Sequence, residues 1–305
     1  MKDILTVSSS PHIRHMDTTR GIMLDVIIAL IPSAVWGCLI FKGAIFVLLT
    51  TVAAAVLAEL VWNFCLKKPI TIGDLSAALT GLLLGMNLPA STPLWIAAIG
   101  SIAAIIVVKQ MFGGLGHNFA NPAITARIIL MVSFPAATTK FTEAFSGIIS
   151  SATPLASSEP TSLKNLFFGL HGGCIGEVSA FLLLVGGLYL VLRRVITPII
   201  PLSFVGTVAL FTLIFGQNPL TAILSGGLML GAIFMATDYT TSPTTPLGKL
   251  IFGIGCGALT FIIRRFASLP EGVSYAILLM NILTPHINRL TLSKPFGFVK
   301  EVKKQ

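Results

Sequence analysis

The stretch AIFVLLTTVAAAVLAELVWNFCL, residues 44–66, holds a single charged residue, Glu59, among apolar and small side chains. A helix of ~20 such residues crosses the ~30 Å hydrocarbon core of a bilayer. Similar runs recur along the chain, so we predict an all-α polytopic membrane protein with about ten transmembrane helices. The predicted spans are residues 22–41, 44–66, 74–90, 93–112, 121–137, 175–192, 199–216, 219–237, 247–264 and 271–290.

The composition of the whole chain supports a membrane protein. Of its 305 residues, 54% are hydrophobic and 10% are charged, whereas a soluble domain carries roughly 25% charged residues. A net charge of +9 would suit nucleic-acid binding in a soluble protein, but in a membrane protein Lys and Arg mark cytoplasmic loops. We therefore expect membrane lipid and no nucleic acid as a partner. The four cysteines lack metal-ligand spacing, so no metal site is expected.

The basic residues also predict the orientation of the spans. With a cytoplasmic N-terminus, five of the 20 Lys and Arg residues lie outside, one lies within a span and the rest lie in cytoplasmic segments. This bias places both termini in the cytoplasm. The N-terminal segment is polar, and no cleavable signal peptide is visible in it. The outer residues are Lys42, Lys140, Lys164, Arg264 and Arg265, and the residue within a span is Arg127.

The chain also resembles itself. Residues 78–85, ALTGLLLG, align with residues 224–231, LSGGLMLG, and further on Lys109 aligns with Arg265. Each repeat would hold five helices, and because five is odd, the second repeat must be inverted in the membrane. In such proteins the functional site tends to lie between the repeats, among broken helices. We divide the chain into a cytoplasmic segment (1–20), a first repeat (21–137), an outer loop (138–174), a second repeat (175–292) and a basic cytoplasmic tail (293–305).

The outer loop is much longer than ordinary connections, which indicates a functional or a disordered segment. It contains SGIISSATPL, residues 146–155, a hydroxyl-rich stretch that by itself is typical of a solvated loop. Two classes of function stay open at this point. The chain could carry a redox cofactor, or it could be a secondary transporter or channel, because inverted repeats with broken helices suit both and a fold does not decide a function.

The segment Ser150-Ser151-Ala152-Thr153 resembles the [Ser/Thr]-Gly-Ala-Thr motif of the RnfD family, which belongs to the Rnf electron-transport complex. The same motif occurs in the related NqrB component of the sodium-translocating NADH:quinone reductase. Ser151 departs from the family, which more often has glycine there, but serine is small enough to substitute. The resemblance covers residues 8 to 292, and it also rests on SSSPHIR (8–14), GHNFANP (116–122) and TDYTTSP (237–243).

In that family a separate flavin transferase links FMN through a phosphoester to the last threonine of the motif, so the resemblance implies covalent FMN on Thr153. Ser150, Ser151 and Ala152 would surround the attachment point, and their small size would let the nucleotide approach the backbone. Pro154 would favour an extended Thr153. We expect the flavin on the outer face of the membrane.

The resemblance further implies a subunit of a ferredoxin:NAD⁺ oxidoreductase complex that couples electron transfer to Na⁺ or H⁺ translocation. The location would be the cytoplasmic (inner) membrane of a bacterium or archaeon. The expected partners are the outer-face FMN subunit, the ferredoxin- and NADH-side subunits and, during maturation, the flavin transferase. This chain would relay electrons through its flavins, and we expect no catalytic activity from it alone.

The segment around Asn118 and Asn121 has two interpretations. In one, Asn121 caps a helix that begins at Pro122. In the other, both amides bind the edge of a non-covalent flavin, since the related reductase carries riboflavin near the cytoplasmic side. Arg127, which is costly in lipid, should face protein or a cofactor.

Acidic residues within spans are candidates for function. Asp25 and Glu59 are therefore candidates for a Na⁺ or proton path. The alternative interpretation is a buried polar pair with Arg20, a threonine or Trp62.

Overall fold

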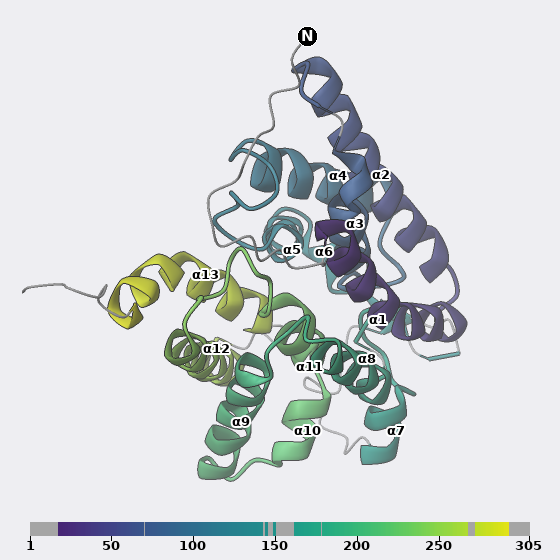
Figure 1. The fold of residues 1–305 in the computed structure, drawn as a ribbon. Coiled ribbons are helices and arrows are strands. Elements are labelled where there is room, and N and C mark those ends of the chain that lie inside the picture. The colour runs from purple at the N-terminus through teal and green to yellow at the C-terminus, as the bar shows by residue number, and fades with distance from the viewer. Residues whose placement is uncertain are drawn as a thin grey trace, which may run out of the picture.

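A computed structural model describes residues 18–69, 71–142, 144–145, 149–150, 162–177, 179–267 and 272–292. These residues form helices almost throughout, and the two halves of the chain lie side by side (Figure 1). Each of the ten predicted spans coincides with at least one helix. The all-α prediction is thus confirmed for the described residues, apart from one short β-hairpin.

The described part of the first half contains five α-helices of ten residues or more, together with shorter helical segments. In order they are α1 (Thr19–Ile40), α2 (Ala44–Cys65), the 3₁₀ turn η1 (Ile72–Asp74), α3 (Ser76–Met86), α4 (Leu94–Ala103), the π-helix η2 (Ala104–Gln110), α5 (Pro122–Ser133) and α6 (Pro135–Thr138).

The second half follows a hairpin of β1 (Phe141–Thr142) and β2 (Ile149–Ser150). Its helices are α7 (Leu163–Phe168), α8 (Ala180–Leu192), α9 (Ile199–Ile214), α10 (Pro219–Leu224), α11 (Leu228–Leu230), the π-helix η3 (Gly231–Met235), α12 (Pro246–Phe266) and α13 (Gly272–Thr291).

The outer surface of the helices is apolar. Phe46 and Phe64 on α2 are 61% and 81% exposed, and Leu213 on α9 is 65% exposed. A surface of this kind faces lipid, because apolar patches of that extent are unfavourable in water. Among the described helices, α1, α2 and α12 are long and apolar enough to cross a membrane alone, and several shorter apolar helices accompany them. The chain is a multi-pass membrane protein.

Local sequence signals account for several helix starts. The side chains of Thr18, Ser179 and Thr245 each accept a hydrogen bond from a backbone N–H in the first turn of α1, α8 and α12. Pro246 occupies the first turn of α12, where its missing N–H costs nothing. The predicted span 121–137 is interrupted in the structure, since α5 ends at Ser133 and Pro135 starts α6.

The predicted start of the sixth span at residue 175 is wrong, because α8 begins only at Ala180. The preceding residues Cys174 and Ile175 are fully buried yet not helical. Their backbone pairs instead with the end of α3: Ile175 N donates to Leu88 O at 3.1 Å, and Gly176 N donates to Met86 O at 2.7 Å. Hydropathy identified the burial, while the conformation depends on this distant partner.

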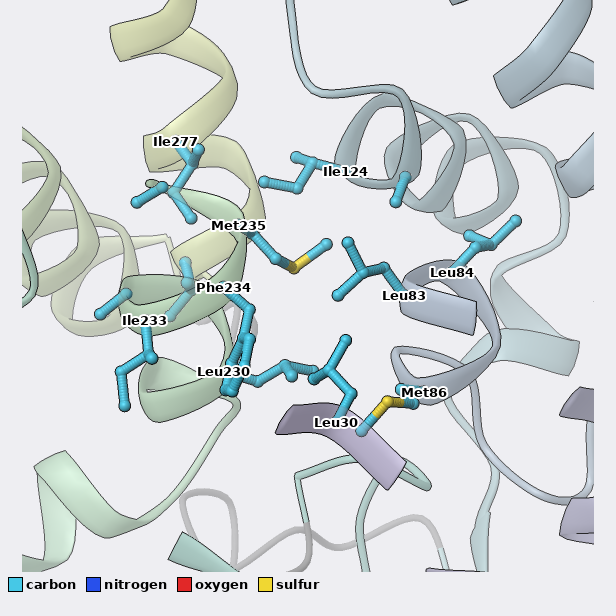
Figure 2. Close-up of a cluster of buried hydrophobic side chains, with 14 of the residues drawn as sticks. Leu30, Leu83, Leu84, Met86, Ile124, Leu230, Ile233, Phe234, Met235 and Ile277 are labelled. Carbon is cyan, nitrogen blue, oxygen red and sulfur yellow. The ribbon is translucent and has the colours of Figure 1, made fainter. Parts of the chain in front are cut away.

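The two halves meet at an apolar cluster that includes residues from α1, α3, α5, α11, η3 and α13 (Figure 2). Met235 points from η3 toward Leu83 and Ile124 of the first half. In addition, α1 contacts α8 and α5 contacts α13. These pairs are the first helices and the fifth helices of the two predicted repeats, and the inverted orientation of the repeats stays a prediction.

A contact made by a basic side chain recurs in both halves. In the first half, Lys109 Nζ on the fourth span reaches the start of the third span, where it donates to Ser76 Oγ at 2.6 Å. In the second half, Arg264 donates to the Ala222, Ser225 and Gly226 carbonyls at 2.8–3.2 Å, where α10 ends and the span breaks. Lys109 aligns with Arg265 in the sequence, whereas the residue that makes the equivalent contact in the structure is Arg264, one position earlier. This shared contact supports the internal repeat.

Candidate functional site at the interface of the two halves

A pocket opens between the halves, where α1 begins and η2 ends. It encloses about 770 Å³ of empty space, including the solvent at its open mouth. In the predicted orientation it faces the cytoplasm. Apolar side chains such as Leu79, Leu83 and Phe234 form much of its wall. The polar lining residues are Ser76, Thr80, Lys109, Asn118, Asn121, Thr237, Asp238, Tyr239 and Thr240.

Asn118 and Asn121, both predicted to bind a flavin, lie on this wall. Asn118 Nδ2 donates to Ala120 O at 3.1 Å and to Thr240 Oγ1 at 3.0 Å, so it joins the two halves. Asn121 Oδ1 accepts from the N–H groups of residues 123 and 124, and Asn121 Nδ2 donates to Met235 O at 3.2 Å. The capping interpretation of Asn121 is confirmed, and contact of either amide with a flavin stays a prediction.

Asp238 lies in the loop that follows η3, on the wall formed by the second half. Its Oδ2 atom accepts hydrogen bonds from Thr240 Oγ1 at 3.0 Å and from Thr241 Oγ1 at 3.2 Å. Burial raises the pKa of the Asp238 carboxyl, and the threonine hydroxyls partly offset this by favouring the ionised form. Asp238 belongs to the TDYTTSP segment (237–243) that resembles the family, and no functional role was predicted for it.

Glu59 is held in a buried ion pair with Lys109. Lys109 Nζ lies 2.9 Å from Glu59 Oε2 and 3.1 Å from Oε1. Thr71 Oγ1 and Gln110 Nε2 also donate to Oε1, at 2.7 and 3.0 Å. The paired alternative for Glu59 is thus confirmed, with a threonine among the partners as predicted and with Lys109 in the place of Arg20. Lys109 was missed because it is 50 residues away along the chain.

Asp25 forms a polar contact between α1 and α8, the first helices of the two repeats. Its Oδ1 accepts from Tyr189 Oη at 2.9 Å and its Oδ2 lies 3.1 Å from Arg193 Nη2. The alternative partner Arg20 is therefore wrong: Arg193 of the second half takes that place. A role for Asp25 or Glu59 in an ion path stays a prediction.

A second polar cluster lies around Arg127. Arg127 Nη1 donates to Asn87 Oδ1 and lies 3.2 Å from Glu177 Oε1, and Nη2 lies 3.4 Å from Cys174 Sγ. The Arg127 and Glu177 side chains are only 4% and 8% exposed. The expectation that Arg127 faces protein is confirmed. Together with the backbone pairing to α3, this contact holds residues 174–177 between the halves.

Thr153, Ser151 and Ala152 lie outside the described residues. Ser150 is described by its backbone, which pairs with Phe141 in the hairpin. On its other side this hairpin is joined to the end of the outer loop, because Thr142 forms a bridge with Gly173. The described residues contain no group of three or more His, Cys, Asp or Glu side chains that could hold a metal ion.

Known proteins resemble the chain along its whole length. The family described as NQR2, RnfD, RnfE matches residues 6–297. The chain belongs to this family. The NQR2, RnfD, RnfE family is the one that the Ser150–Thr153 segment and its companion motifs predicted, so the predicted resemblance is confirmed.

Three members of the NQR2, RnfD, RnfE family illustrate the similarity. The chain is 48% identical to the D subunit of the Na(+)-translocating ferredoxin:NAD(+) oxidoreductase complex of Acetobacterium woodii, with 99% of this chain and 98% of the relative covered. It is 43% identical to the D subunit of the proton-translocating ferredoxin:NAD(+) oxidoreductase complex of Clostridium ljungdahlii, with 97% of each covered. It is 38% identical to the D subunit of the ion-translocating oxidoreductase complex of Stutzerimonas stutzeri, with 90% and 91% covered.

Proposed function

We propose that this chain is the flavin-carrying D subunit of an ion-translocating ferredoxin:NAD⁺ oxidoreductase complex, with FMN esterified to Thr153. The observation that carries the proposal is the full-length similarity to two relatives named as this subunit, at 48% and 43% identity. Their names give different ions, Na⁺ and H⁺, and the proposal covers either. The same similarity favours electron transfer over the alternative of a secondary transporter or channel.

The proposed partners are the outer-face FMN subunit and the ferredoxin- and NADH-side subunits, in the cytoplasmic membrane of a bacterium or archaeon. A tagged full chain purified from its native membrane in mild detergent should bring down an assembly that reduces NAD⁺ with reduced ferredoxin. The control is a preparation from cells that carry the untagged chain. Recovery of the intact tagged chain without such activity, from membranes that have the activity, would contradict the proposal.

The pocket is proposed to hold a second, non-covalent flavin such as riboflavin. The residues that line it support this proposal: its apolar walls can pack the faces of the flavin ring, and its amides and hydroxyls can bind the polar edge. Asn118, Thr240 and Ser76 would orient the ring, while Leu79, Leu83 and Phe234 would exclude water from it. The bound flavin would supply the electron-accepting chemistry, and the chain its position and electrostatics.

Asn118→Leu is expected to lower the content of acid-extractable flavin about tenfold. The change removes an amide from the pocket wall and the hydrogen bond to Thr240 across the halves. Leaving a polar edge without a partner costs ~1–3 kcal/mol. Flavin per chain is measured by fluorescence after acid precipitation.

The control for this prediction is Asn218→Ser, a change at the exposed cap of α10 that keeps a capping hydroxyl. It should retain the wild-type flavin content. Wild-type content in a monodisperse Asn118→Leu protein would show that Asn118 does not bind the flavin.

A further inference from the structure

In the Glu59–Lys109 ion pair, the positively charged residue lies nearer the pocket than the negatively charged one. Lys109 is one of the residues that line the pocket, together with Ser76 and Asn118. Glu59 comes from α2 behind it and is not among the lining residues. The pair is almost fully buried, with 3% of Lys109 and 1% of Glu59 exposed. It therefore acts as a fixed dipole whose positive end is part of the pocket wall.

Several hydrogen bonds hold this dipole in place. Two consecutive residues of the π-helix η2, Lys109 and Gln110, both reach the Glu59 carboxylate. Lys109 Nζ also donates to Ser76 Oγ, and Ser76 in turn donates to Asp74 Oδ1 at 2.6 Å. π-Helical turns are rare in proteins, and many of those that do occur are found at functional sites. The ammonium group cannot rotate away from the pocket without leaving these partners.

The other charged groups at the pocket are few. Asp238 lies on the wall formed by the second half. Asp74 is linked to Lys109 by way of Ser76, whose hydroxyl accepts from Lys109 and donates to Asp74. Asp25 on α1 is paired with Arg193, whose side chain is 57% exposed and screened by solvent. Among the described lining residues Lys109 is the one cationic side chain.

A buried ion pair is weak evidence for stability, because apolar replacements of the same volume are often neutral or stabilising. Its electrostatic field, in contrast, is strong where water is excluded. We propose that the Glu59–Lys109 pair sets the reduction potential of the ligand in this pocket. The inference rests on the proposed pocket flavin and assigns Lys109 and Glu59 as positioning residues that act on it by charge.

The sign of the effect follows from the direction of the dipole. A reductant transfers one electron to the ring, which gains one negative charge unless a proton follows, and no bond of the protein is made or broken. The nearer ammonium group of Lys109 stabilises that charge, and the more distant Glu59 carboxylate opposes it less. The pair as a whole therefore raises the reduction potential of the ring.

The two single variants should shift the potential in opposite directions. Lys109→Met removes the positive end and should lower the potential. Glu59→Gln removes the carboxylate paired with the ammonium, which still donates to Ser76, and should raise the potential. The double variant should lie between them. Each single shift should be about tenfold in the equilibrium constant for reduction, which is about 59 mV for a one-electron couple.

The experiment uses the full chain with Thr153→Ala, so that only pocket flavin is observed, reconstituted in lipid nanodiscs. The flavin spectrum is followed during titration with dithionite and mediator dyes. The matched control is Lys249→Met. Lys249 donates a hydrogen bond to Thr197 and is not among the residues that line the pocket. This control should keep the wild-type potential.

Opposite shifts with an intermediate double variant support the inference, because a loss of packing would move both single variants the same way. Shifts of the same sign, or no shift, would overturn the inference and leave the pocket flavin standing. A starting protein with no acid-extractable flavin would overturn the pocket assignment itself, and the inference with it.

Discussion

Thr153→Ala is expected to abolish the yellow flavin fluorescence of the denatured chain on a gel under ultraviolet light. A phosphoester survives denaturation, whereas a flavin held by non-covalent contacts is lost with the fold. Alanine has no hydroxyl group to form the ester. The wild type and the variant are co-expressed with the flavin transferase, and band fluorescence is divided by the amount of protein in the band.

Two controls separate the anchor from the rest of the outer loop. Thr161→Ala changes another threonine of the same predicted loop and should leave the fluorescence unchanged. Ser151→Gly restores the residue more common in the family and should also keep it. A fluorescent Thr153→Ala band would place the flavin on a different residue. A non-fluorescent wild type, made together with the transferase, would remove covalent FMN from the proposal.

Arg127→Met is expected to destabilise the fold by about 3–5 kcal/mol, the usual effect of removing one partner of a buried ion pair. Glu177, whose side chain is 8% exposed, would lose its ion-pair partner. Asn87 and Cys174 would lose a donor as well. Thermal unfolding in detergent should show a lower midpoint, by on the order of 5–10 °C.

A double-mutant cycle tests whether the pair itself is responsible. Arg127→Met with Glu177→Gln should cost less than the two single changes added together, because no unpaired charge remains. Arg193→Met breaks a pair in which the arginine is 57% exposed, and it should cost less than ~1 kcal/mol. Equal effects of Arg127→Met and Arg193→Met would contradict the prediction.

Cys174 reports on the same contact. Its thiol is fully buried beside Arg127, so a maleimide reagent should label it slowly in the folded wild type. In Arg127→Met, residues 174–177 lose their ion pair and labelling should become faster. The measurement uses a Cys65→Ser background, because Cys65 is exposed. Unchanged protection of Cys174 would mean that the backbone pairing with α3 suffices to hold this segment.

The sequence by itself determined the fold class, because burial in lipid is a property of each segment. An apolar run such as residues 44–66 is transferred out of water whichever helices it packs against, and its backbone hydrogen bonds form within its own helix. Helix starts such as Asn121-Pro122 were predictable for the same reason, since the cap and its acceptors are neighbours in the chain. The family was likewise readable from short motifs, which need no three-dimensional arrangement.

Only the tertiary structure decided which polar groups meet. Lys109 and Glu59 are 50 residues apart in the chain, as are Arg127 and Glu177, and Asn118 reaches Thr240 across 122 residues. Hydropathy shows that such a group is buried, and a buried polar group needs a partner, but nothing local identifies the partner. The pocket and the direction of its ion pair arise only when the two halves pack together.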